Sequence, residues 1–201
     1  MDELEQIISL YDERVKKFGY DAKSVGWKSK DQQELRFRIL TQNVELANQS
    51  IIDIGCGFGD FYDFLCKSGS VPLQYTGIDI SNEVLKIARE RYNNIPHVEF
   101  LNQQLMSKPE NFFDYAVASG SLNYNFRIDM NQYIEKFISI YQGSVRKGLL
   151  INLLTTKVDY TQEIHVHYSP GYIETVFRRY FREVRLIENY GLYEFTIQGL
   201  K

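Results

Sequence analysis

Ile51-Ile-Asp-Ile-Gly-Cys-Gly-Phe-Gly-Asp60 is the stretch of the chain that decides the fold. Ile51, Ile52 and Ile54 form a β-branched apolar run, which is typical of a strand buried on both faces. Three alternating glycines follow, and apolar residues then recur at helical spacing. The stretch therefore predicts a strand, a glycine turn and the start of a helix, so that a ligand can lie against bare backbone.

A second apolar strand, Tyr75-Thr-Gly-Ile-Asp-Ile-Ser81, ends on an acid. Asp79 lies about two dozen residues after Gly55, the spacing at which such folds place a ribose-binding carboxylate. The glycine loop alone is a weak signal and fits a βαβ turn that binds nothing. The loop together with the spaced acid predicts a nucleotide-like ligand.

Two acids beside the loop indicate the charge of that ligand. A dinucleotide fingerprint needs a third glycine at position 60, where this chain has Asp60. Its charge would repel a diphosphate, and Asp53 adds a second carboxylate just before the loop. A ligand carrying an ammonium and a sulfonium fits this arrangement better.

These residues resemble a known superfamily. Asp53-x-Gly55-Cys56-Gly57-x-Gly59, followed by the strand that ends at Asp79, looks like motif I and the acidic second strand of class I S-adenosylmethionine-dependent methyltransferases. The resemblance implies an α/β fold: a Rossmann-like, seven-stranded, mostly parallel sheet with helices on both faces and a C-terminal antiparallel hairpin. It also implies that the glycines hold the methionine part, with Asp53 near its amino group and Asp79 on both ribose hydroxyls.

A segment before the first strand resembles a smaller, largely uncharacterised bacterial group within that superfamily. The matching residues are Gly26-Trp27-Lys28-Ser29 and Gln33-x-x-Arg36-Phe37, although the group has a small residue where Lys28 stands. The resemblance implies that this segment lies across the cofactor, with Arg36 on the methionine carboxylate. A guanidinium suits that role, but a structural ion pair is an equally open interpretation.

Two later turns complete the predicted cofactor site. Gln104 stands where the superfamily commonly has an acid for the adenine amino group, and Ser119, Gly120 and Asn123 match the smaller group in the turn after the fourth strand. The predicted cofactor-binding residues, for S-adenosyl-L-methionine and its product S-adenosyl-L-homocysteine, are Trp27, Arg36, Asp53, Gly55, Cys56, Gly57, Gly59, Asp79, Ile80, Gln104, Leu105, Ser119 and Gly120.

The chain divides into two predicted parts. Residues 1–48 form an N-terminal helical extension covering the cofactor site, with helices over 2–18 and from the Ser29/Gln32 capping box to about Ala47. Residues 49–201 form the class I methyltransferase domain. Its last segments, Phe181 to Glu188 and Leu192 to Leu200, predict the antiparallel hairpin.

Composition limits the function classes. The 201 residues are 44% hydrophobic and 24% charged, with a net charge of −3, so no dedicated nucleic-acid module is expected. Two cysteines cannot build a disulfide framework or a four-ligand metal site. Without a signal peptide or a long apolar span, we expect a cytoplasmic protein with no membrane contact, as a monomer or a homodimer.

Candidate catalytic residues follow the fifth strand. His165 and His167 are candidate general bases, because an unperturbed imidazole titrates near pH 6.5, and Tyr124 is a further candidate. A His-x-His pair is also typical of some metal sites, but without a clear third ligand no metal is expected. Aromatic residues that could line an acceptor pocket are Tyr11, Tyr20, Trp27, Tyr124 and Tyr168.

The leading hypothesis is a methyltransferase that modifies nitrogen or oxygen of a small-molecule acceptor. The alternatives are a binding protein for S-adenosylmethionine or S-adenosylhomocysteine without transferase activity, a protein or nucleic-acid methyltransferase, and an NAD or nucleotide-sugar enzyme. No Asn/Asp-Pro-Pro-Tyr/Phe sequence follows the fourth strand, which weighs against methylation of exocyclic amines in bases or of glutamine.

Overall fold

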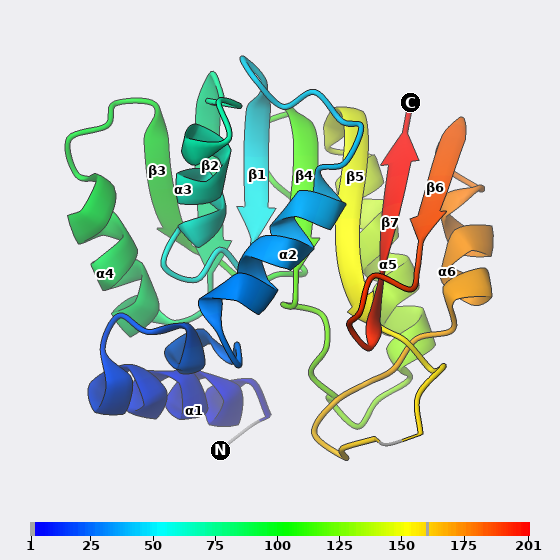
Figure 1. The fold of residues 1–201 in the computed structure, drawn as a ribbon, viewed down its shortest axis with the longest axis horizontal. Coiled ribbons are helices and arrows are strands. Elements are labelled where there is room, and N and C mark those ends of the chain that lie inside the picture. Colours follow the sequence, from blue (N-terminus) through cyan, green and yellow to red (C-terminus); the bar gives the residue numbers. More distant parts are fainter. Residues whose placement is uncertain (1–2, 160) are drawn as a thin grey trace.

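The computed structural model describes residues 3–159 and 161–201, and it is built on one seven-stranded sheet (Figure 1). The strand order is β3-β2-β1-β4-β5-β7-β6, and β7 runs antiparallel to both of its neighbours while β1 to β5 pair in parallel. This confirms the predicted fold class with its C-terminal hairpin. The strands are β1 (Ser50–Ile54), β2 (Gln74–Asp79), β3 (Val98–Asn102), β4 (Phe113–Ser119), β5 (Val145–Leu154), β6 (Glu183–Ile187) and β7 (Glu194–Leu200).

Helices cover both faces of the sheet. Alternation along β1 sends Ile51 into a core with α2, α3 and α4, and Ile52 into a core with α5 and α6. Figure 1 shows α2 and α3 in front of the sheet and α5 behind it. The helices are α1 (Glu3–Phe18), α2 (Lys30–Leu40), α3 (Asp60–Lys67), α4 (Asn82–Tyr92), α5 (Met130–Gln142) and α6 (Pro170–Phe177), with a short 3₁₀ helix η1 (Ala22–Val25).

The second helix ends earlier than the sequence predicts, at Leu40 instead of about Ala47. Its start is as predicted, because the Ser29 hydroxyl accepts a hydrogen bond from the Gln32 amide at 3.3 Å. Its end is set from the other end of the chain, since the Gln198 side chain donates to the carbonyls of Leu40 and Gln42 at 3.0 and 2.9 Å. A partner from β7 thus satisfies carbonyls that a longer helix would have used.

The first helix lies across the carboxyl edge of the parallel strands instead of on a face of the sheet (Figure 1). It packs on η1 and α4, and the Ser81 hydroxyl donates to the Asp12 carboxylate at 2.6 Å. Phe18, at the C-terminal end of this helix, is 42% exposed. Position 2, where the predicted helix begins, lies outside the described residues. The helix therefore covers the edge at which open α/β sheets bind ligands.

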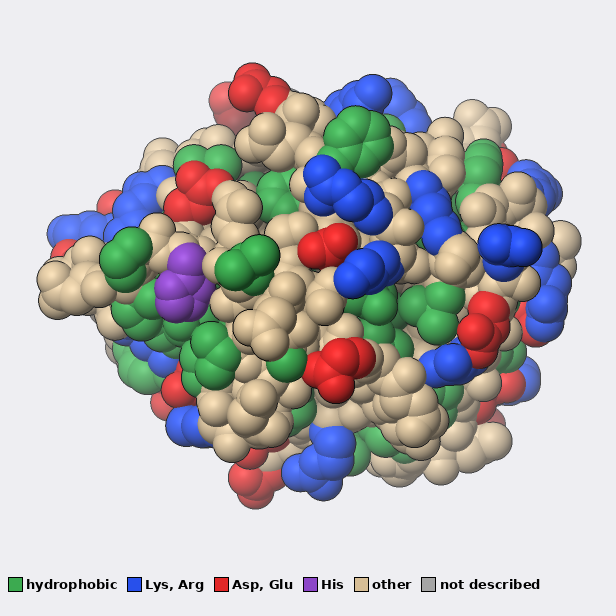
Figure 2. Space-filling view, turned by 90° about the horizontal axis from the view of Figure 1, so that it is seen from above, with side chains coloured by type: hydrophobic (Ala, Val, Ile, Leu, Met, Phe, Trp, Pro, Cys, Tyr) green, Lys and Arg blue, Asp and Glu red, His purple; other side chains and the backbone are tan. Residues whose placement is uncertain are grey.

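The opposite edge, at the amino ends of the parallel strands, has a mixed surface. Figure 2 shows basic and acidic side chains interspersed on this face, with apolar side chains between them. None of the described helices combines the length and the apolar character that a membrane span requires.

Candidate functional site

A cavity of about 810 Å³ lies at the carboxyl edge of the sheet, under α1. Two sets of residues line it. The strand-end wall comes from the turns after β1, β2 and β3 and consists of Asp53, Gly55, Gly57, Asp79, Ile80 and Gln104. The outer wall comes from α1 and from the segments after β4 and β5, and consists of Tyr11, Arg14, Tyr124, Phe126, His165 and His167.

The turn after β1 brings bare backbone to the cavity. The amides of Gly55 and Cys56 both donate to the Ile78 carbonyl, at 2.8 and 3.0 Å, which fixes the turn on β2. Gly55 has φ +74°, and a Cβ there would lie 2.2 Å from the Cβ of Ser121. Only glycine therefore fits at Gly55, because both the backbone conformation and the neighbour exclude a side chain.

Asp53 is buried just below this turn and is 4% exposed. Burial raises its pKa from the ordinary value of 3.8 to about 7, and the neighbouring Asp79 acts in the same direction. The Tyr75 hydroxyl donates a short hydrogen bond to the carboxylate and partly opposes this rise. A cationic group placed beside Asp53 would favour its ionised form.

Asp79 is held by the backbone at the end of β2. One carboxylate oxygen accepts from the Gly57 amide and the other from the Ser81 amide, both at 3.0 Å. Burial raises the pKa of Asp79, and these amides oppose the rise. Each oxygen keeps a lone pair, so the carboxylate can accept two further hydrogen bonds from adjacent hydroxyls.

The structure brings the predicted cofactor-binding residues together around this cavity, with the exception of Gly59. Trp27 closes over Gly120, where a Cβ would lie 2.5 Å from the indole ring. Gly59 instead caps α3 with φ +76° and packs against Phe100 and Tyr92. Gly59 therefore shapes the turn before α3 and does not itself line the cavity.

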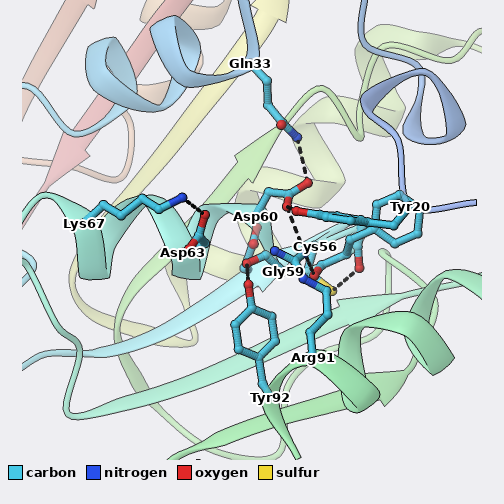
Figure 3. Close-up of polar contacts among 12 residues, drawn as sticks. Tyr20, Gln33, Cys56, Gly59, Asp60, Asp63, Lys67, Arg91 and Tyr92 are labelled. Carbon is cyan, nitrogen blue, oxygen red and sulfur yellow. Dashed lines mark hydrogen bonds and ion pairs between the residues drawn. The ribbon is translucent and has the colours of Figure 1, made fainter. Parts of the chain in front are cut away.

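Asp60 also lies away from the cavity lining, contrary to its predicted electrostatic effect on the ligand. Figure 3 shows it joined to three elements: it accepts from the Tyr20 hydroxyl at 2.7 Å and the Gln33 amide at 3.4 Å, and it pairs with Arg91 at 2.8 Å. The guanidinium of Arg91 compensates its charge. Asp60 thus connects the N-terminal segment to α3 and α4, and its charge also helps to raise the pKa of Asp53, so its predicted effect on a diphosphate stays a prediction.

Arg36 lines the cavity, but it is already bound by a carboxylate. Glu194 of β7 accepts from Nε and Nη2 at 2.6 and 2.5 Å, and Nη1 donates to the Gln32 carbonyl at 3.0 Å. The indole ring of Trp27 lies 4.5 Å from the guanidinium carbon. The structure therefore contains the alternative structural ion pair, while the predicted contact of Arg36 with a ligand carboxylate stays a prediction.

The outer wall is largely aromatic. Tyr124 and Phe126 pack edge to face with ring centroids 5.3 Å apart, and Tyr133 follows at 5.2 Å. The segment after β5 is anchored by Asn123, whose side chain accepts from the Leu154 amide at 3.1 Å and whose carbonyl accepts from Val166 at 3.0 Å. These contacts hold the rings and the histidines on one side of the cavity.

All three predicted catalytic residues, Tyr124, His165 and His167, line the cavity. Burial lowers the pKa of both imidazoles, and the charges of His167 and Arg14 lower that of His165 further. The imidazoles are thus neutral at neutral pH, the form in which a base can accept a proton. The described residues include no group of three or more His, Cys, Asp or Glu side chains placed to hold a metal ion.

Two of the predicted pocket aromatics lie elsewhere. Tyr20 is half-exposed on the Asp60 contact, and Tyr168 is 1% exposed in the core, where its hydroxyl donates to the Leu122 carbonyl at 3.1 Å. Asn152 of β5 links two hydroxyls: it accepts from Ser119 at 2.8 Å and donates to Thr196 at 2.5 Å.

Arg14, Ser121 and Glu194 are among the lining residues that the sequence interpretation missed. Ser121 abuts Gly55, and its hydroxyl donates to the Ile54 carbonyl at 2.7 Å. The Ser-Gly-x-x-Asn turn gave a signal for Ser121. Arg14 stands on an ordinary amphipathic helix and Glu194 in a terminal strand, so no local pattern marks either of them.

The sheet order, the glycine turn after β1 and the acid that ends β2 together define the class I methyltransferase architecture. The sequence profile described as a methyltransferase domain matches residues 51–142. A protein of Mycobacterium tuberculosis (strain ATCC 25618 / H37Rv) named as a methyltransferase, Rv1506c, is 31% identical over 154 residues, which cover 74% of this chain and 90% of that protein. The chain belongs to the class I S-adenosylmethionine-dependent methyltransferase superfamily.

More distant relatives agree with this assignment. The ubiquinone/menaquinone biosynthesis C-methyltransferase UbiE of Campylobacter jejuni is 27% identical over 158 residues, 76% of this chain and 61% of that protein. Magnesium protoporphyrin IX methyltransferase from Synechocystis PCC 6803, solved with bound S-adenosylmethionine, has a TM-score of 0.70 at 13% identity and covers 100% of this chain and 98% of that one. The structure of DhpI in complex with S-adenosylhomocysteine also has a TM-score of 0.70, at 18% identity, and the match covers 97% of this chain and 95% of that one.

Proposed function

We propose that this protein transfers the methyl group of S-adenosylmethionine to nitrogen or oxygen of a small-molecule acceptor. The observation that carries the proposal is the cavity under α1, in which the strand-end wall and the aromatic outer wall face a common space of about 810 Å³. Pockets of roughly 300–1,000 Å³ suit small ligands and cofactors. A segment of folded protein or of duplex nucleic acid would first have to displace α1.

The strand-end wall fits the methyl donor. Asp79 offers two acceptor oxygens to the ribose hydroxyls, and the bare backbone at Gly55 and Gly57 leaves room for the methionine part. Asp53 provides a buried carboxylate for the ammonium group, and Gln104 can accept from the adenine amino group. When bound, S-adenosylmethionine supplies an activated methyl group on a sulfonium centre.

The outer wall fits the acceptor. Methyl transfer is an in-line displacement, so the main task of the protein is to hold the nucleophile opposite the methyl carbon. The aromatic residues of the outer wall provide flat apolar surface for this purpose. A hydroxyl nucleophile also has to lose a proton, which His165 or His167 would accept, whereas a neutral amine needs only to be oriented.

The names of two similar proteins specify small-molecule acceptors, which supports a small-molecule acceptor for this chain. UbiE is a C-methyltransferase of quinone biosynthesis, and the neighbour from Synechocystis methylates magnesium protoporphyrin IX. Both names specify small molecules. They also show that carbon is a third acceptor atom to be considered when products are analysed.

The test is a transfer assay with a divided cell extract. Purified protein and S-adenosylmethionine are incubated separately with the dialysable and the macromolecular fractions, and formation of S-adenosylhomocysteine is followed. We expect product only with the dialysable fraction, together with a metabolite that gains one methyl group, whose position mass spectrometry and NMR then locate. Methyl incorporation into protein or nucleic acid would overturn the proposal. Tight cofactor binding without turnover in either fraction would instead identify a binding protein.

A further inference from the structure

Arg14 is a charged side chain of the cavity that the proposed reaction does not use. It lies on α1, lines the outer wall and is half-buried. Within residues 3–159 and 161–201 the structure gives its guanidinium no carboxylate partner. A partly buried cation favours an anion nearby, because withdrawing a charge from water is costly unless it is paired.

The guanidinium is held in place by its neighbours. The ring of Tyr11, one turn earlier on α1, lies 5.7 Å from the guanidinium carbon. A Cβ on Gly26 would lie 3.6 Å from Nη1, so the group rests over bare backbone. The buried Ser24 hydroxyl donates to the Arg14 carbonyl at 3.3 Å and joins this end of α1 to η1. The Arg14 guanidinium therefore lies between an aromatic ring and bare backbone, on a part of α1 that is joined to η1.

The acids that line the same cavity are already engaged. Asp53 is bonded to Tyr75, Asp79 to two backbone amides, and Glu194 to Arg36. Arg36 itself is satisfied by Glu194 and by the Gln32 carbonyl. Lys28, which also lines the cavity without an ion pair, is exposed to solvent. Arg14 is thus the uncompensated, partly enclosed cation of the described lining.

The surroundings of Arg14 belong to the acceptor side of the cavity. Arg14 lines the same cavity as His165, and its charge contributes to the lowered pKa of that imidazole. His165 is paired by a strand-like bridge with Tyr124, whose ring packs on Phe126. A ligand that reaches Arg14 therefore also contacts aromatic surface.

We propose that Arg14 binds a carboxylate of the methyl acceptor, so that the acceptor is an aromatic acid. This inference rests on the proposed function and specifies its substrate class. The guanidinium presents two parallel N–H donors, the geometry that a carboxylate accepts in a bidentate contact. The carboxylate would complete the charge balance of the cavity, and the aromatic body would lie against Tyr124 and Phe126.

The test measures ligand charge preference without requiring turnover. The protein is saturated with S-adenosylhomocysteine, and calorimetry compares two matched pairs of probes, benzoate with benzamide and indole-3-acetate with indole-3-acetamide. We expect the acid of at least one pair to bind about tenfold or more tightly than its amide, as a charge-assisted bidentate contact implies. Arg14→Gln should abolish this preference and Arg14→Lys should restore part of it.

A matched control separates recognition from general electrostatics. Lys16→Gln removes the same charge from an exposed position of the same helix and should leave the preference intact. The inference is overturned if no acid binds more tightly than its amide, or if the preference survives in Arg14→Gln. It is also overturned if Arg14→Gln weakens binding of S-adenosylhomocysteine itself about tenfold, because Arg14 then serves the cofactor carboxylate.

The two proposals fail separately. If the divided extract yields a methylated metabolite that is neutral or cationic, the proposed function stands and the role of Arg14 is rejected. If the acids bind through Arg14 but no low-mass compound is ever methylated, the binding site stands and the transferase proposal is rejected.

Discussion

The strand-end wall and the outer wall of the cavity are held by different kinds of interaction. Backbone amides build the strand-end wall: Gly55 and Cys56 donate to Ile78, and Gly57 donates to Asp79. The outer wall is a set of side chains on α1 and on two loop segments, packed ring against ring. The difference teaches that the strand-end wall is fixed by the sheet, whereas residues of the outer wall can be exchanged without changing a strand.

The largest effect is expected on the outer wall. If an oxygen acceptor is used, alanine at the residue that serves as base, either His165 or His167, should lower kcat by roughly 10²–10⁴-fold, the usual contribution of a general base. Because the pKa of both histidines is lowered, wild-type kcat should fall only below the ordinary histidine range near pH 6.5. The check is steady-state kinetics over pH, with S-adenosylhomocysteine affinity as the control. Full activity in both alanine variants removes the base hypothesis.

The next effect concerns the strand-end wall. Asp79→Ala should weaken binding of S-adenosylmethionine by about 100-fold, because two hydrogen bonds from the ribose to a buried carboxylate are lost. The fold should persist, since the variant also removes a desolvated acid whose pKa is raised. Isothermal calorimetry gives the affinity and circular dichroism the melting temperature. An unchanged affinity in a folded variant would reject the ribose role.

A pH effect should distinguish the walls further. Asp53 has a pKa of about 7 and must ionise to hold an ammonium group, so affinity for S-adenosylmethionine should fall by about tenfold per pH unit below pH 7. Asp53→Asn should lose most of this dependence, whereas Glu90→Gln, at an exposed position, should keep it. Calorimetry between pH 5 and pH 8 makes the comparison. An identical pH profile in Asp53→Asn would contradict the assignment.

The raised pKa of Asp53 also predicts how the stability of the protein depends on pH. Its folded pKa lies above the unfolded value of 3.8, so the folded state binds the extra proton between these values and loses stability as the pH rises through about 7. Asp53→Asn should therefore be more stable relative to wild type at pH 8 than at pH 5. Urea denaturation at the two pH values measures this difference, and the opposite sign would refute the raised pKa.

The smallest effect is expected outside both walls. Tyr20→Phe removes the hydroxyl that donates to Asp60 at 2.7 Å, which should cost about 1 kcal/mol of unfolding free energy. Affinity for S-adenosylmethionine should stay unchanged, because neither Tyr20 nor Asp60 lines the cavity. Urea denaturation and calorimetry check the two statements. A large loss of affinity would move this contact into the binding site.

The parts of the fold that local sequence specifies were predictable. The Ile51–Ile54 run, the glycines and the spacing to Asp79 fix strand, turn and acid within about thirty residues, as βαβ units do. Capping by Ser29 was likewise visible, because a cap needs only its own first turn. These features indicated the fold and most of the strand-end wall.

Features set by distant partners were not predictable. Gln198 binds a carbonyl at the end of α2. Arg36 forms an ion pair with Glu194, and Asp60 forms one with Arg91. Periodicity also cannot separate an aromatic residue of the core from one of the cavity, so Tyr168 and Tyr124 looked alike. Arg14 was missed for a related reason: it becomes notable only when the folded lining shows which acids are already paired.

The pairing of Arg36 with Glu194 joins residues 158 positions apart in the chain. Since Glu194 belongs to the last strand, a nascent chain leaving the ribosome exposes Arg36 long before its counter-ion is synthesised. Strands β1 and β2, which carry Asp53 and Asp79, can pair earlier. Docking of α2 through Arg36 therefore has to wait for the final hairpin, whereas α1 packs on η1 and α4, which are made earlier.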